Sequence, residues 1–273
     1  MSARALLRSR RLAAGALVLA ATFVAAIAGL LLAGDPFAPS ETILSSPSRA
    51  HLLGTDELGR DILARLLHGA ATALLVAIPP ALVAGLVGAA VGLVAGYHGG
   101  LLDEALLKLM ELILVIPRFL LAVVVVALFG GQLWLVGAVL ALTFWPHTAR
   151  LVRGEAISLR ERQFVEAARA VGGSDGWILV RHLWPLVLPI LAVNVSFQAA
   201  QGALIESGLA FLGLGDRDVV SWGAMLADAQ SYLGLAWWTS VSPGLSLAVL
   251  IVALNLLGDG LSDACNVRRA NRA

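Results

Sequence analysis

Long apolar segments constrain what this chain can fold into. A helix needs about 20 apolar residues to cross the hydrocarbon core of a membrane. The segments that reach this length are approximately 12–34, 70–96, 105–128, 132–150, 186–206 and 241–262. They are continuous and rich in Leu, Ala and Gly, whereas the strands of a membrane barrel alternate over about ten residues. With 59% hydrophobic and 14% charged residues, the sequence predicts an all-α membrane protein with six transmembrane helices.

The first apolar segment has arginines before it, as a secretory signal does. It is longer than the roughly 7–15 apolar residues of a signal, and no A-x-A site precedes Asp35, so we expect an uncleaved span. Short basic segments stay in the cytoplasm. This rule places both termini and the segment 151–185 inside, and leaves four arginines outside: Arg49, Arg60, Arg65 and Arg217.

Several protein classes find no support in the sequence. A net charge of +1 without a basic tail gives no reason to expect a nucleic-acid partner. Cys265 is the only cysteine and cannot form an internal disulfide, and the five histidines are scattered, so no metal cluster is expected. The sequence contains no G-x-x-x-x-G-K-[ST] phosphate loop, no H-E-x-x-H and no G-x-S-x-G. We therefore expect no enzyme and no bound cofactor in this chain.

The segment 151–185 is charged, yet it has helical signals. The string "SLRE" from Ser158 is a capping box, which predicts a helix start there. Gly172 with Gly173 should end this helix, and Ser174 should cap a second short helix that runs to Trp184 and stops at Pro185. Two short helices joined by a glycine turn are predicted. Their apolar side chains pack either against the chain's own spans or in a groove of a partner.

Here the sequence resembles a known family. "EAARAVGGSDGWILVRHLWP" is similar to the EAA loop of ABC importer permeases, whose pattern is matched by Glu166, Ala167, Ala168, Gly172 and Pro185. "RH" shortly before this proline is typical of the peptide and nickel branch. Segments 51–70, 96–117, 149–174, 206–226 and 255–264 resemble, in order, the C-type permease of dipeptide, oligopeptide and nickel importers.

The resemblance implies a type I ABC importer permease fold in a bacterial inner membrane. The implied partners are a second, different permease chain, two ATPase subunits that bind ATP and Mg²⁺, and an extracytoplasmic substrate-binding protein. The implied cargo is di- or oligopeptides, with nickel or a metal chelate as the alternative. The implied ATPase-coupling residues are Phe164, Val165, Glu166, Ala167, Ala168, Arg169, Gly172, Trp177 and Pro185. Glu166 and Arg169 would supply polar contacts, and Phe164, Val165 and Trp177 would be apolar anchors.

Two other groups of residues are candidates for function. The segment 54–69 predicts a short amphipathic helix on the outer surface, and by resemblance it forms part of the vestibule with Thr55, Asp56, Arg60 and Asp61. The alternative is a helix that only seals the bundle. In the fifth span, polar residues at helical spacing predict a translocation lining, with purely structural hydrogen bonds between helices as the alternative: Asn194, Gln198, Gln201 and Glu206.

The sequence also predicts how parts of the bundle meet. Small residues four apart, at Ala84, Gly88, Gly92 and Gly96, should let another helix approach closely. Pro117 should bend the third span between Glu111 and Arg118, which are candidate partners. We expect an anchor and external segment over 1–69, a permease core over 70–264, and a cytoplasmic tail over 265–273.

Two rival classes remain as alternatives. An ion-coupled secondary transporter would need no internal docking loop. An intramembrane aspartyl protease would use the "GLGD" string at 213–216, but that copy lies beyond the fifth span and should be solvated.

Overall fold

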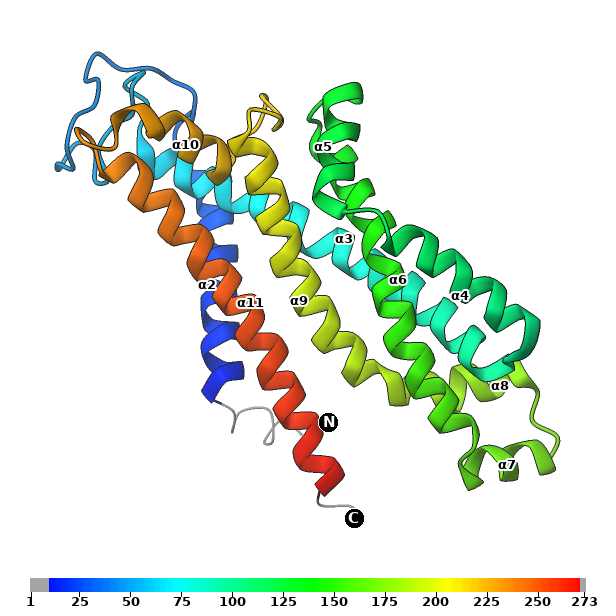
Figure 1. The fold of residues 1–273 in the computed structure, drawn as a ribbon. Coiled ribbons are helices and arrows are strands. Elements are labelled where there is room, and N and C mark those ends of the chain that lie inside the picture. The colour runs from blue at the N-terminus through cyan, green and yellow to red at the C-terminus, as the bar shows by residue number, and fades with distance from the viewer. Residues whose placement is uncertain (1–9, 271–273) are drawn as a thin grey trace.

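The computed structural model describes residues 10–270, and within this range the chain is built from helices, with one isolated antiparallel bridge between Thr55 and Asp61 (Figure 1). The elements in chain order are α2 (Arg10–Leu32), α3 (Ile62–His98), α4 (Gly100–Leu114), α5 (Arg118–Phe129), α6 (Leu133–Arg160), α7 (Gln163–Ala170), α8 (Asp175–Ile178), the π-helical turn η1 (Leu179–Leu183), α9 (Trp184–Phe211), α10 (Trp222–Ala229), the 3-10 turn η2 (Gln230–Tyr232) and α11 (Trp238–Ala270).

The predicted all-α membrane fold is confirmed. Within residues 10–270, five helices are long and apolar enough to cross a membrane: α2, α3, α6, α9 together with α8 and η1, and α11. The third predicted span, 105–128, is not one helix, because α4 and α5 meet at an angle of 69°. The bend lies at Pro117, as expected, since proline has no N–H to donate and clashes with the preceding turn. Counted as one broken crossing, α4 and α5 bring the number of spans in the described part of the chain to six.

The glycine face of α3 lies against α6, as its spacing predicted. A Cβ atom on Gly88 would lie 2.5 Å from the carbonyl oxygen of Trp145, and one on Gly96 would lie 2.6 Å from that of Arg153. Both partner residues belong to α6. The two backbones therefore touch over several turns, and a side chain at these positions would force them apart.

The remaining spans join this pair mainly through α3, which also packs against α2 and α9. Gly15 and Gly29 let α2 pack closely on α11 and α3, where a Cβ would lie 2.7 Å from backbone atoms of Ala253 and Leu67. In Figure 1, the start of α2 and the last turns of α11 lie toward the end of the molecule that carries α7. We call this the α7 end. The opposite end, which carries α10, is called the α10 end.

Three local predictions are wrong. Ser158 does not start a helix, because α6 continues to Arg160 and α7 begins only at Gln163. Pro185 does not end the second short helix, because α8 continues through η1 into α9 without a break. Proline fits the first turn of α9, where a backbone N–H would have no partner within the helix. The segment 54–61 is a loop rather than part of a surface helix, and α3 starts at Ile62.

The expected boundary between residues 69 and 70 therefore falls inside α3. The backbone of α11 extends through 265–270, which was expected as part of the tail. The basic segment 1–9 and residues 271–273 lie outside the described residues.

Replacing Gly88 by alanine should destabilise the bundle. The added methyl group has no room between α3 and α6, and overpacking of this kind costs about 1–3 kcal/mol. Gly154→Ala is the matched control, because Gly154 is also helical and has open space around it. Unfolding of the purified proteins in detergent, followed by tryptophan fluorescence, should show a lower midpoint for Gly88→Ala only. Equal midpoints for both variants would contradict the close packing.

Candidate functional site

The segment between α6 and α9 forms a rigid helical hairpin, residues 161–183, which we call the hairpin. Gly172 ends α7 with a φ of +84°, and its N–H donates to the carbonyl of Arg169. The N–H of Gly173 reaches back to the carbonyl of Ala168. This pair of bonds is a Schellman motif, which requires one residue in the left-handed conformation. Glycine adopts this conformation without strain. Ser174 then accepts a hydrogen bond from the N–H of Trp177 and caps α8, as predicted.

One side of the hairpin is buried against the spans. Val165, Ala168, Ile178 and Leu183 join a core cluster that also contains Leu93 of α3. Val165 has no exposed surface, so its prediction as an anchor available to a partner is wrong. The sequence could not assign this face, because the choice depends on which side of α7 meets α3 and α6.

A polar contact fixes the hairpin to the end of α3. The Tyr97 hydroxyl donates to Asp175 at 2.6 Å, and Arg169 Nε donates to the same hydroxyl at 3.3 Å. The Arg169 guanidinium also lies 5.0 Å from the centre of the Tyr97 ring, within cation–π range. Tyr97 therefore holds both helices of the hairpin, one through Arg169 and one through Asp175.

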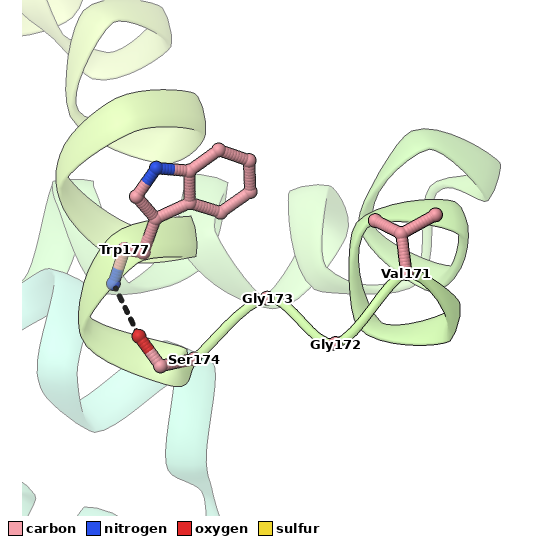
Figure 2. Close-up of a pocket in the computed structure, with 5 residues that line it drawn as sticks. All are labelled: Val171, Gly172, Gly173, Ser174 and Trp177. Atoms are coloured by element: carbon pink, nitrogen blue, oxygen red, sulfur yellow. Dashed lines mark hydrogen bonds between the residues drawn. The ribbon is translucent and has the colours of Figure 1, made fainter.

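The other side of the hairpin leaves apolar side chains exposed. Val171 is 82% exposed, Val180 72%, Trp177 47% and Phe164 40%. Figure 2 shows Val171 and Trp177 on opposite sides of the glycine turn, where they line a hollow of about 390 Å³ together with Gly172, Gly173 and Ser174. Apolar side chains gathered around a hollow are typical of a surface that binds another protein.

Other predicted coupling residues lie around this surface. Glu166, Ala167 and Arg169 are exposed on α7, and Pro185 is exposed in the first turn of α9. The Trp177 ring packs edge-on against His182, with 4.6 Å between ring centres, which orients the indole. The hairpin thus presents a supported surface rather than a mobile loop.

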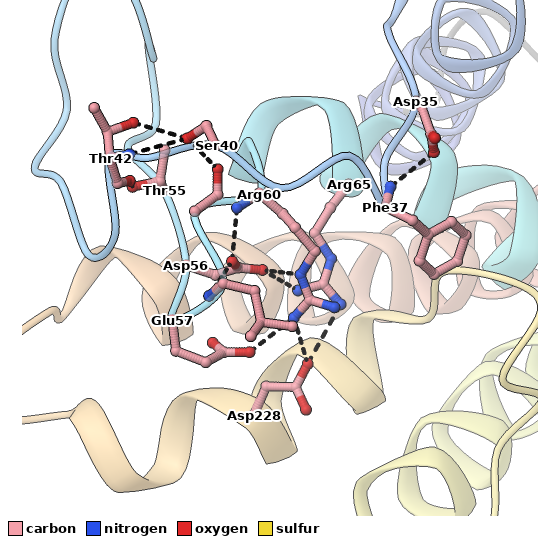
Figure 3. A network of polar contacts seen from close by, with 12 residues as sticks. Asp35, Phe37, Ser40, Thr42, Thr55, Asp56, Glu57, Arg60, Arg65 and Asp228 are labelled. Carbon is pink, nitrogen blue, oxygen red and sulfur yellow. Dashed lines mark hydrogen bonds and ion pairs between the residues drawn. The ribbon is translucent and has the colours of Figure 1, made fainter.

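The predicted vestibule residues belong to a partly buried network of polar and charged side chains at the α10 end, with Asp56 and Arg65 at its buried centre (Figure 3). Arg60 Nε donates to Asp56 at 2.6 Å and Arg60 Nη2 donates to Glu57 at 2.7 Å, while Arg65 also pairs with Asp56. Both arginines reach Asp228 of α10 at 3.3 Å. Burial raises the pKa of Glu57, because the carboxylate loses water on folding.

Thr55 and Asp61 complete the framework of this loop. Thr55 is fully buried and accepts from the N–H of Ser45, and Asp61 caps α3 by accepting from the N–H of Ala64. Asp61 also pairs with His51 at 2.8 Å. These side chains hold the loop to α3 and α10, so their geometry is that of a support for the surface at the α10 end. No local sequence signal identifies Asp228, and the sequence places Arg65 outside without giving it a role.

The polar stripe of the fifth span divides into two kinds of environment. Asn194 and Gln198 are buried and donate to the Thr148 hydroxyl at 2.6 and 2.9 Å, and Gln198 also donates to the carbonyl of Phe144 at 3.1 Å. They bond α9 to α6. Glu206 is buried near the α10 end beside Ser207, and Gln201 is exposed.

Arg118 lies beside Gln201 rather than beside Glu111. Its Nη1 donates to Gln201 Oε1 at 3.1 Å, and its guanidinium lies 5.3 Å from the centre of the Phe144 ring. The candidate pair of Arg118 with Glu111 is therefore replaced by a contact between α5, α6 and α9.

Comparison with known proteins agrees with this architecture. The family described as binding-protein-dependent transport system inner membrane component matches residues 88–270. The chain is 35% identical over 263 residues to the dipeptide transport system permease protein DppC of Alkalihalophilus pseudofirmus, covering 94% of this chain and 86% of that protein. It is 38% identical over 219 residues to the glutathione transport system permease protein GsiD of Pectobacterium atrosepticum, covering 80% and 73%.

The chain therefore belongs to the binding-protein-dependent transport system inner membrane component family. It is a multi-pass membrane protein and a permease component of such a transport system.

Tyr97→Phe should loosen the hairpin without disturbing the spans. The change removes the donor to Asp175 and the acceptor for Arg169, and losing such a bond costs about 1 kcal/mol. Trypsin should cleave the hairpin at its arginines about fivefold faster, as that free energy implies. The chain's only other tyrosine, Tyr232, lies at the α10 end, so Tyr232→Phe is the control. Equal cleavage rates would show that Tyr97 does not hold the hairpin.

Proposed function

We propose that this chain is the transmembrane permease subunit of an ATP-driven importer of di- or oligopeptides. The two relatives described above are named for dipeptide and glutathione transport, and glutathione is itself a small peptide. An importer that depends on a binding protein receives its cargo from outside. The permease then supplies the path across the membrane. ATP and Mg²⁺ are bound by a separate ATPase subunit.

The hairpin is the element that couples to the ATPase. The observation that carries this role is a supported apolar surface at the end of the bundle, where Val171 and Trp177 line a hollow and Phe164 is exposed on the same hairpin. An isolated solvated loop has no reason to expose these side chains, whereas a groove in a partner would cover them. Glu166, Ala167 and Arg169 border the surface, and Val165 and Ala168 hold it from beneath.

The α7 end lies in the cytoplasm in this proposal. Arginines concentrate on the hairpin and on the nearby turns of α6, and such segments stay inside. The described ends of the chain lie toward the same end (Figure 1), so both termini are cytoplasmic. The α10 end then faces outward in a bacterial inner membrane.

The other partners follow from this orientation. The substrate-binding protein docks at the outer surface that the network around Asp56, Arg60 and Asp228 supports. Six crossings supply half of a pathway, so a second permease, a different chain, faces this one, and two ATPase subunits serve the pair. Gln201 of α9 is exposed and belongs to the pathway, whereas Glu206 is buried beside Ser207, and Asn194 and Gln198 hold α9 to α6.

Trp177→Ala tests the coupling role directly. A large aromatic anchor at the centre of an interface is worth about 2 kcal/mol or more, so the fraction of ATPase that co-purifies with the permease should fall by about tenfold or more. Trp134→Ala is the matched control, because Trp134 is 69% exposed at the start of α6, away from the hairpin. Unchanged association and uptake in Trp177→Ala would refute the docking role. A Gly172→Ala variant, strained at its positive φ, should show a smaller loss in the same assay.

A further inference from the structure

An arginine lies near the middle of the membrane with no acidic partner in the described chain. Arg118 contacts Phe144, which follows the start of α6 by eleven residues, or about 16 Å at about 1.5 Å per residue. Gln201 precedes the end of α9 at Phe211 by ten residues, a similar depth. The hydrocarbon core is about 30 Å thick, so both contacts place the guanidinium near its centre.

A cation at this depth must face water or protein, because lipid leaves it unsatisfied. Arg118 is half-buried, and the described chain accepts one of its N–H groups, through Gln201. No ion pair of the described residues includes Arg118. The ring of Phe144 supports one side of the guanidinium, which leaves further N–H donors for a group outside this chain.

The neighbouring exposed groups have the same character. His147 and Arg150 are exposed on α6, and their separation of three residues places them on one face. His147 follows Phe144, whose ring lies against the Arg118 guanidinium, by three residues on the same face of α6. Together Arg118, His147 and Arg150 form a track of nitrogen donors that leads from mid-membrane toward the α7 end.

We propose that Arg118, held by Gln201 and Phe144, binds the terminal carboxylate of a peptide as it crosses the membrane. The inference rests on the proposed function and names the group of the cargo that this surface recognises. A carboxylate is common to all unmodified peptides, so recognising it tolerates any side chain. Arginine binds carboxylates through paired, charge-assisted hydrogen bonds. Several donors in a row suit a group that moves, whereas a fixed ion pair with a neighbouring subunit would need only one cation.

The first experiment compares a free and an amidated peptide in the complete transporter, reconstituted in vesicles with its binding protein. Arg118→Gln should lower dialanine uptake by about tenfold or more and leave uptake of dialanine amide unchanged. The ratio of the two rates is compared between variant and wild type, so the selectivity of the binding protein cancels. Lys108→Gln, which removes an exposed cation of α4, is the control and should change neither rate. An equal loss for both peptides would assign Arg118 to an ion pair between subunits and overturn the proposal.

Gln201→Glu offers a variant of nearly unchanged shape. Gln201 Oε1 lies 3.1 Å from Arg118 Nη1, so a carboxylate at this position would form an ion pair with the guanidinium. Dialanine uptake should then fall as it does in Arg118→Gln. Unchanged uptake of dialanine would count against the proposal.

A second measurement does not depend on delivery of the amide. Arg118→Cys is combined with Cys265→Ser, which removes the only native cysteine of this chain. A cationic or an anionic methanethiosulfonate is then added to the aqueous solution. The cationic reagent should restore dialanine uptake, the anionic reagent should not, and excess dialanine should slow the labelling. Failure of the cysteine to react from water, or equal effects of both reagents, would overturn the proposal. If the wild-type transporter imports another solute and no peptide, the proposed function itself fails.

Discussion

The close contact between the backbones of α3 and α6 is the constraint on which the rest of the structure depends. Inside a membrane, apolar side chains gain little by meeting one another, so helices associate through close packing and hydrogen bonds. Gly88 and Gly96 permit that packing, and the contact continues toward the α7 end, where Arg160 donates to the carbonyl of Gly96 at 3.1 Å. Arg153 pairs with Asp103 and ties α4 to the same pair. The hairpin is attached here through Tyr97, so a displacement of the hairpin acts on α3 and α6 as a unit.

Polar side chains within the spans meet the cost of burial in two ways. Thr148 accepts hydrogen bonds from the side-chain amides of Asn194 and Gln198, which pairs these donors inside the chain and joins α6 to α9. Arg118 and Gln201 bond to each other and keep part of their surface exposed. The first arrangement gives rigidity, and the second leaves donors for a group that this chain does not supply. The same stripe of α9 is therefore structural at Asn194 and Gln198 and open to a transport role at Gln201, one turn further along the helix.

Sequence reasoning succeeded where the signal was local or periodic. The apolar segments, the glycine spacing on α3, the turn at Gly172 and the cap at Ser174 each depend on a few neighbouring residues. It failed where packing overrides a local signal, as at Ser158, where α6 continues through the capping box because its face is buried against α3. The buried side of α7 at Val165 depends on a docking geometry that no periodicity supplies. The pairing of Arg65 with Asp228 joins residues 163 positions apart, which a single sequence cannot reveal.

The central claim is that an ATPase subunit binds the hairpin in the cytoplasm. The accessibility of one cysteine tests this claim most directly. Val171 is 82% exposed at the glycine turn, so Val171→Cys with Cys265→Ser gives a single reactive thiol on the surface in question. A membrane-impermeant maleimide should label it in inside-out vesicles stripped of the ATPase, and adding the ATPase back should protect it. Labelling from the outer side of intact cells, or labelling that the ATPase does not slow, would contradict the account.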